Sequence, residues 1–122
     1  AEVTATGVSE AEVASARGDP SLSRAAICRL DVRDGAEVRS LVASFESLDI
    51  LVNCAGIIRR HEELDPETFA AVIDVNLVGS MRVCAAARPL LAKARGSIVN
   101  LASMLSFFGG GLVPGYAASK GG

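Results

Sequence analysis

The stretch Leu48-Asp49-Ile50-Leu51-Val52-Asn53-Cys54-Ala55-Gly56 decides the fold class of this 122-residue chain. Its first five residues are apolar except for Asp49, so they predict a strand buried on both faces. Strands of this kind are typical of parallel sheets that helices cover on both sides. The residues from Asn53 onward then end the strand in a loop.

Three other short segments predict further strands because they are apolar or rich in valine and threonine: residues 1–6, 25–30 and 97–101. Capping signals predict that helices begin between the strands, and these signals are Ser9 with Glu12, Asp34, and Asp65-Pro66. The helix that follows Asp65-Pro66 is long, and a final helix carries Tyr116. This alternation predicts an α/β fold with a doubly wound parallel sheet in three layers, α/β/α.

Candidate site residues follow three of the predicted strands. Asp31 comes after the strand at 25–30, Asn53 after the strand at 48–52, and Ser103 after the strand at 97–101. In an open parallel sheet, ligands bind beyond the carboxyl ends of the strands, which meet at one edge. The sequence therefore predicts a ligand site at that edge.

Composition excludes several classes of function. The chain has 12 basic and 14 acidic residues, a net charge of −2, and no run of like charges, so nucleic acid is not an expected partner. Charged residues interrupt each apolar stretch, and no secretory signal is visible, so we expect no membrane partner and a cytoplasmic protein. The cysteines are widely spaced, and we expect buried free thiols: Cys28, Cys54 and Cys84. No cluster of metal-ligating residues is visible.

Tyr116 and Lys120 are the pair with the clearest chemistry. Tyr116 is the only tyrosine, and Lys120 is one of two lysines. Their spacing of four residues places both side chains on one face of a helix. A nearby ammonium group favours the phenolate form of a tyrosine, which makes the phenol usable as a general acid or base. Taken alone, such a pair more often decorates a helix surface.

Three further features accompany this pair: Asn76 within the long helix, Ser103 after the last strand, and Asn53-Cys54-Ala55-Gly56. In this order and approximate spacing, the residues resemble the classical short-chain dehydrogenase/reductase family. The resemblance implies that Tyr116 exchanges a proton with a substrate hydroxyl or carbonyl and that Ser103 hydrogen-bonds the same oxygen. It implies that Lys120 binds the nicotinamide ribose and that Asn76 holds a water in a proton relay. The alternatives are that Ser103 is a strand-terminal cap and that Asn76 is a polar residue inside the helix that bonds nearby main chain.

The resemblance also implies a nucleotide site and a Rossmann-like fold. The family motif is Asn-Asn-Ala-Gly, so Asn53, Ala55 and Gly56 match it as cofactor-binding residues. Cys54 departs from the motif, and we expect slightly altered sheet support there. Two further residues are expected at the adenine: Asp31 at its amino group, with an ordinary helix cap as the alternative, and Val32 lining its pocket.

The resemblance also implies that the residue ending the strand at 1–6 decides between NAD and NADP, and Thr6-Gly7-Val8-Ser9 is neither acidic nor basic. This leaves both cofactors open. The stretches 56–60 and 103–107 resemble family members that act on 2-dehydro-3-deoxygluconate and gluconate, mostly with NAD, which favours NAD. Arg59 or Arg60 could pair with the carboxylate of such a sugar acid. The alternative is a solvated charged loop that includes His61, Glu62 and Glu63.

Two other functions stay open: a 3-oxoacyl-thioester reductase of the same fold, and a non-catalytic nucleotide-binding fragment. Family members are longer than this chain, so we expect residues 1–122 to be one partial NAD(P)-binding Rossmann domain. The first strand with its glycine-rich turn and the C-terminal part would then lie outside it. We expect such a fragment neither to fold stably nor to catalyse. The parent protein is expected to be a homodimer or homotetramer that binds a small alcohol or ketone.

Overall fold

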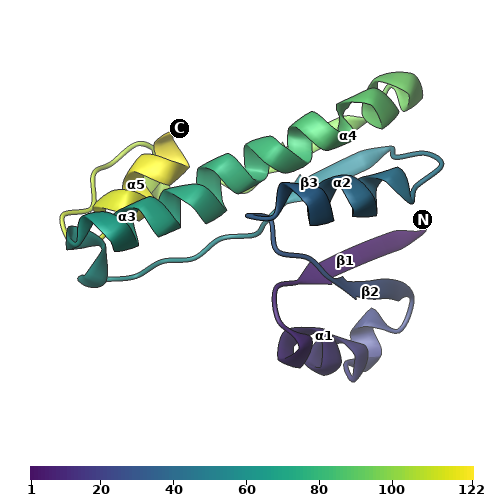
Figure 1. The fold of residues 1–122 in the computed structure, drawn as a ribbon, viewed down its shortest axis with the longest axis horizontal. Helices are drawn as coiled ribbons and strands as arrows, with labels where there is room; N and C mark the ends of the chain where they lie inside the picture. Colours follow the sequence, from purple (N-terminus) through teal and green to yellow (C-terminus); the bar gives the residue numbers. More distant parts are fainter.

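The computed structural model describes residues 1–122 as strands and helices in alternation (Figure 1). The strands are β1 (Val3–Gly7), β2 (Ala25–Arg29), β3 (Ile50–Asn53) and β4 (Ser97–Asn100). The helices are α1 (Glu10–Arg17), α2 (Gly35–Ala43), α3 (Pro66–Ile73), α4 (Ser80–Ala94) and α5 (Pro114–Gly121). Short helical turns are η1 (Pro20–Leu22), η2 (Glu62–Leu64), η3 (Asp74–Gly79) and η4 (Met104–Ser106). The predicted elements are confirmed, with ends shifted by one or two residues.

The capping signals act as the sequence predicts. The Ser9 hydroxyl accepts a hydrogen bond from Glu12 N at 3.2 Å, and the Glu12 carboxylate accepts one from Ser9 N in return. Asp34 accepts from the main chain at the start of α2, and Asp65 accepts from Thr68 N at the start of α3. Each cap satisfies amide groups that a helix leaves unpaired in its first turn.

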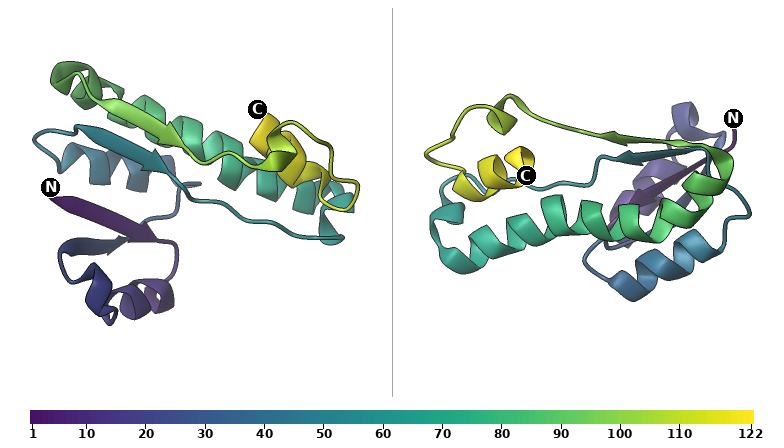
Figure 2. Two further views of the ribbon diagram at one scale, coloured as in Figure 1. Left: turned by 180° about the vertical axis from the view of Figure 1, so that it is seen from behind. Right: turned by 90° about the horizontal axis from the view of Figure 1, so that it is seen from above.

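The four strands form two separate parallel pairs instead of the single sheet expected. β1 pairs with β2, and β3 pairs with β4. Figure 1 and the left view of Figure 2 show that β1, the strand of the first pair nearer to the second, does not join β3. Both β1 and β3 therefore keep one edge without strand pairing. The α/β class with parallel strands is confirmed.

Residues 66–94 form one continuous helical rod, in which the π-helical turn η3 joins α3 to α4. Pro89 lies inside α4 without interrupting it. Charged residues do not shorten the apolar stretch here as expected from the sequence, because by length and composition alone this helix could span a membrane. The rod packs against β3, β4, α2 and α5, as expected of a core helix in an α/β fold.

Burial is low for a chain of this length, since 12 of 122 residues are buried. Asn53 bonds Cys84 in α4, so α4 covers the face of the second strand pair that carries Asn53. On the opposite face, Ile50 is 61% and Val52 51% exposed. The cysteines are free, as predicted, but the expectation that they are buried was wrong, because Cys28 and Cys84 are only partly buried and Cys54 is exposed.

Candidate active site

Helix α5 carries the predicted pair, and Lys120 lies beside Tyr116 as the four-residue spacing predicts. The Lys120 ammonium nitrogen is 5.8 Å from the centre of the Tyr116 ring. It donates a hydrogen bond to the main-chain oxygen of Leu101 at 2.6 Å. Because Leu101 directly follows β4, this bond holds the only phenol and its neighbouring cation at the carboxyl end of that strand.

Ser103 lies two residues beyond Leu101 and caps η4, which packs against α5. Its hydroxyl oxygen accepts a hydrogen bond from Leu105 N at 3.2 Å, as the capping alternative predicts. Its own O–H donates no hydrogen bond within the chain. A hydroxyl can accept and donate at once, so the cap leaves the donor available.

Asn76 is buried within η3 and joins the loop after β3 to α5. Its side-chain oxygen accepts from Ile57 N at 2.8 Å, and its amide donates to Ile57 O at 2.9 Å and to Ser119 Oγ at 3.0 Å. The Ser119 hydroxyl in turn donates to Tyr116 O at 2.8 Å. Asn76 therefore bonds main chain, as the alternative holds, but this main chain is nineteen residues away in sequence. π-helical turns are frequent at functional sites.

The loop after β3 presents bare main chain at the sheet edge. The Asn53 amide donates to Asn100 Oδ1 at 2.8 Å, so Asn53 itself ties β3 to β4 where Cys54 departs from the motif. Ala55 and Gly56 are exposed. A Cβ added to Gly56 would lie 3.4 Å from Asn76 Oδ1, so the loop runs close to the π-helical turn.

Asp31 and Val32 lie at the end of β2, in the other strand pair. The Asp31 carboxylate accepts from the Arg33 guanidinium at 2.9 Å and 2.6 Å. These hydrogen bonds from Arg33 lower the pKa of Asp31 from 3.8 to about 2. Val32 packs against Gly79 of η3, where an added Cβ would lie 2.6 Å from Val32 Cγ2. Val32 thus connects the end of β2 to the π-helical turn.

A family model described as short chain dehydrogenase matches residues 1–122. The chain belongs to the short-chain dehydrogenase family. The resemblance found in the sequence is thereby confirmed at the level of the family, and so is the Rossmann-like fold class of an incomplete domain. The roles of the individual site residues stay predictions.

Other members of the short-chain dehydrogenase family resemble the chain over much of its length. A 2-dehydro-3-deoxy-D-gluconate 5-dehydrogenase of Bacillus subtilis is 48% identical over 77 residues, which are 60% of this chain and 30% of that protein. A 3-oxoacyl-[acyl-carrier-protein] reductase of Chlamydia muridarum is 36% identical over 90 residues, which are 71% of this chain and 36% of that protein. The chain thus spans about a third of the length of these relatives.

A crystal structure of a protein of Sinorhizobium meliloti, assigned as a short-chain alcohol dehydrogenase, has the same fold. Its TM-score is 0.83 at 32% sequence identity, with 99% of this chain and 52% of that chain covered.

Two glutamates were not identified from the sequence as functional candidates: Glu63, which contacts α5, and Glu12, which lies at the end of β1 in the first strand pair. Glu63 was interpreted as part of a solvated loop, and this was wrong because its side chain is buried. Its carboxylate accepts from Tyr116 N at 2.7 Å. Glu12 was recognised only as part of a capping box, yet its carboxylate also accepts from Val8 N at 2.7 Å. The capping signal could have pointed to this position. In a capping box the glutamate side chain reaches back to the main chain before the helix, which here is the end of β1.

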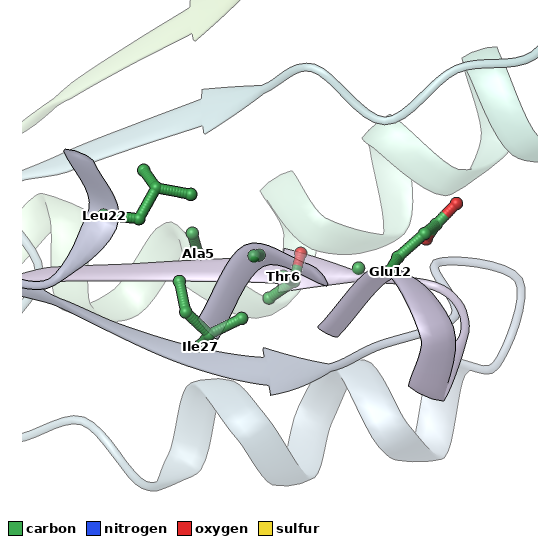
Figure 3. A pocket seen from close by; sticks show the side chains of 7 residues that line it. Ala5, Thr6, Glu12, Leu22 and Ile27 are labelled. Atoms are coloured by element: carbon green, nitrogen blue, oxygen red, sulfur yellow. The ribbon is translucent and has the colours of Figure 1, made fainter. Parts of the chain in front are cut away.

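An open, mostly apolar pocket of about 290 Å³ lies between α1 and the first strand pair. Figure 3 shows Ala5, Leu22 and Ile27 along it and Glu12 at one end. Figure 1 shows α1 and the first strand pair far from α5, so the pocket that they line is separate from Tyr116 and Lys120.

Proposed function

We propose that residues 1–122 carry the proton-transfer residues and part of the nucleotide site of an NAD(P)-dependent oxidoreductase that interconverts an alcohol and a ketone. The observation that carries the proposal is the position of Lys120, between the Tyr116 ring and the end of β4. A tyrosine with a fixed ammonium group beside it is an arrangement that suits general acid–base catalysis, so we assign the proton exchange to Tyr116.

In this reaction Tyr116 exchanges a proton with the substrate oxygen. Ser103 supports the same oxygen with its free O–H while its own oxygen continues to accept from Leu105 N. Asn76 uses both N–H groups of its amide on Ile57 and Ser119, so a relay water would bind at an oxygen of Asn76. The nicotinamide group, when bound, supplies or accepts the hydride.

The residues at the strand ends fit a dinucleotide. Ala55 and Gly56 are exposed and carry no side chain larger than a methyl group, so a ribose can approach the main chain. The ionised Asp31 carboxylate suits an adenine amino group, and the Lys120 ammonium suits ribose hydroxyls. These groups follow the carboxyl ends of the strands, where nucleotides bind in such folds.

Glu12 supports NAD over NADP. In the short-chain dehydrogenase family the adenosine ribose is expected at the end of β1, where a carboxylate accepts the ribose hydroxyls and repels a 2′-phosphate. The end of β1 contains no acidic residue of its own, but Glu12 lies 2.7 Å from Val8 N and 3.3 Å from Ser9 N. Helix α1 thus supplies the negative charge that the strand end lacks.

Two exposed arginines support a sugar acid as the substrate. Arg59 and Arg60 follow the loop after β3, and neither belongs to any of the three ion pairs of the chain. A free guanidinium can bind a carboxylate through two parallel hydrogen bonds. The Bacillus relative is named for a sugar acid, 2-dehydro-3-deoxy-D-gluconate.

A 3-oxoacyl thioester is the second candidate substrate. Three apolar side chains in and beside η4 are well exposed: Met104 at 78%, Phe107 at 85% and Phe108 at 69%. Such a surface next to Ser103 would suit an acyl chain, and the Chlamydia relative is named for this activity. Turnover with an acyl thioester instead of a sugar acid would favour this candidate.

We also propose that these residues are one part of a longer polypeptide, with a further strand between β1 and β3. The two unpaired edges and the length of the relatives support this.

A homodimer or homotetramer is proposed because the apolar side chain of Met81, on α4, is 66% exposed. A cytoplasmic location is proposed because the cysteines are free. Light scattering of the longer polypeptide would test the assembly.

The proposed activity is tested by following cofactor reduction in the longer polypeptide with NAD or NADP and a panel of sugar acids, neutral polyols and acyl thioesters. Tyr116→Phe removes the exchangeable proton, so kcat should fall by about 10²–10⁴. Ser40→Ala, on the exposed side of α2, is the control. Folded protein without turnover in the whole panel, or full activity of Tyr116→Phe, would contradict the proposal.

A further inference from the structure

Glu63 is a buried acid in an exposed part of the chain. Its side chain is 1% exposed, whereas Glu62 before it is exposed and Leu64 after it is 64% exposed. It belongs to none of the three ion pairs. A buried carboxylate without a cation requires strong hydrogen bonds to be tolerated.

Main-chain amides supply those hydrogen bonds. Glu63 Oε1 accepts from Arg59 N at 2.7 Å, and Oε2 accepts from Tyr116 N at 2.7 Å. Tyr116 is the third residue of α5, and Val113, the residue in the capping position of α5, makes no side-chain hydrogen bond there. Glu63 therefore caps α5 from a distant part of the chain. A carboxylate at this end is also favoured by the helix dipole.

A second contact joins the residues next to Glu63 to the chain just before α5. His61 N donates to Leu112 O at 2.9 Å, and His61 adopts a φ of 70°, which is uncommon for a residue other than glycine. Space opposite Glu63 is tight, since a Cβ added to Gly115 would lie 3.3 Å from Glu63 Oε2 and 3.2 Å from Phe69 Cδ2. Residues 59–63, called here the arginine segment, are thus fastened to the helix that carries Tyr116.

We propose that Glu63 is a positioning residue that fixes the main chain of Tyr116 relative to Arg59 and Arg60. One carboxylate holds the segment that would bind an anionic substrate and the helix whose phenol exchanges the proton. This sets the spacing between the substrate carboxylate and the reacting oxygen. The inference rests on the proposed function. It goes further because it names Glu63, a residue placed in contact with neither substrate nor cofactor, as the group that links substrate binding by the arginines to proton transfer by Tyr116.

The test compares two oxidations catalysed by the longer polypeptide: that of gluconate and that of glucitol, in which an alcohol replaces the carboxylate. Glu63→Gln keeps one acceptor oxygen but places an amide N–H against the second main-chain N–H. The ratio of kcat/KM for gluconate to kcat/KM for glucitol should fall by about tenfold or more, as the loss of a charge-assisted hydrogen bond suggests. This ratio does not depend on the fraction of folded enzyme.

Glu62→Gln is the matched control, since it removes the same charge from a neighbouring exposed side chain and should leave the ratio unchanged. If Glu63→Gln does not fold, Gly115→Ala gives the second measurement, because its methyl group would crowd the Glu63 carboxylate and should lower the same ratio. An unchanged ratio in the folded variant would overturn the inference. Wild-type enzyme that oxidises neither compound nor any other member of the panel would instead contradict the proposed function.

Discussion

The Lys120 ammonium group donates a 2.6 Å hydrogen bond to Leu101 O, which joins the last helix of the chain to the end of β4. The bond lies two residues before Ser103 in sequence and beside the ring of Tyr116. A single lysine therefore sets both the position of α5 on the strand end and the charge next to the phenol.

Lys120→Met should remove both effects, because methionine keeps much of the side-chain length but neither the charge nor the donor. We expect kcat to fall by about 10²-fold or more, as for loss of a general acid–base pair. The only other lysine, Lys93, lies in the last turn of α4, and Lys93→Met is the matched control. Steady-state kinetics of both variants in the longer polypeptide checks this; equal activity of the two variants would refute it.

Glu12→Gln should relax the choice of cofactor. The carboxylate near Val8 N would repel a 2′-phosphate, so its neutralisation should raise the ratio of kcat/KM for NADP to that for NAD. One close charge pair corresponds to an increase of about tenfold. The carboxylate of Glu10, also in the first turn of α1, accepts no hydrogen bond from this end of β1, so Glu10→Gln serves as the control. A similar change in both variants would show that only overall charge matters.

Arg33→Gln should raise the pKa of Asp31 from about 2 toward 3.8, because the Arg33 hydrogen bonds are the main cause of the lowered value. A depressed pKa in the folded state means that ionised Asp31 stabilises the fold above about pH 4. That stabilisation is lost as the pH falls toward 2. The effect on unfolding should be modest, since the Arg33 side chain is 51% exposed and solvent screens the pair.

An NMR titration of the Asp31 carboxyl group measures this pKa directly in the longer polypeptide. Arg24 is exposed and belongs to no ion pair, so Arg24→Gln should leave the Asp31 titration unchanged. If Asp31 titrates at the same pH in wild type and Arg33→Gln, the guanidinium is not what holds its pKa low.

Local signals in the sequence predicted the elements well. Ser9, Asp34 and Asp65 each cap a helix because their partners lie within three residues of them. The four strands were also predicted, since their apolar character depends on short stretches alone. The candidate site was predicted in part for the same reason: Tyr116 and Lys120 face each other through the geometry of one helical turn.

The features that sequence reasoning missed depend on distant partners. Glu62 and Glu63 look alike in sequence, and only the contact of Glu63 with an amide 53 residues away distinguishes them. The π-helical turn around Asn76 was also missed, because the apolar pattern of the rod continues through it without a break. The separation of the strands into two pairs was missed as well. Each strand would have the same apolar pattern in one continuous sheet as in two separate pairs, so the pattern does not show which strands are neighbours.

The last prediction concerns residues 1–122 as an isolated polypeptide. Between β1 and β3 no strand pairing exists, and the face of β3 with Ile50 and Val52 lies exposed. With 12 of 122 residues buried, little apolar surface leaves water to offset the entropy of ordering the chain. Heating should therefore give a gradual change in circular dichroism, whereas the longer polypeptide, with its added strand, should melt cooperatively. A cooperative melt of residues 1–122 alone would show that the two strand pairs need no strand between them, and would remove the main structural support for a longer parent.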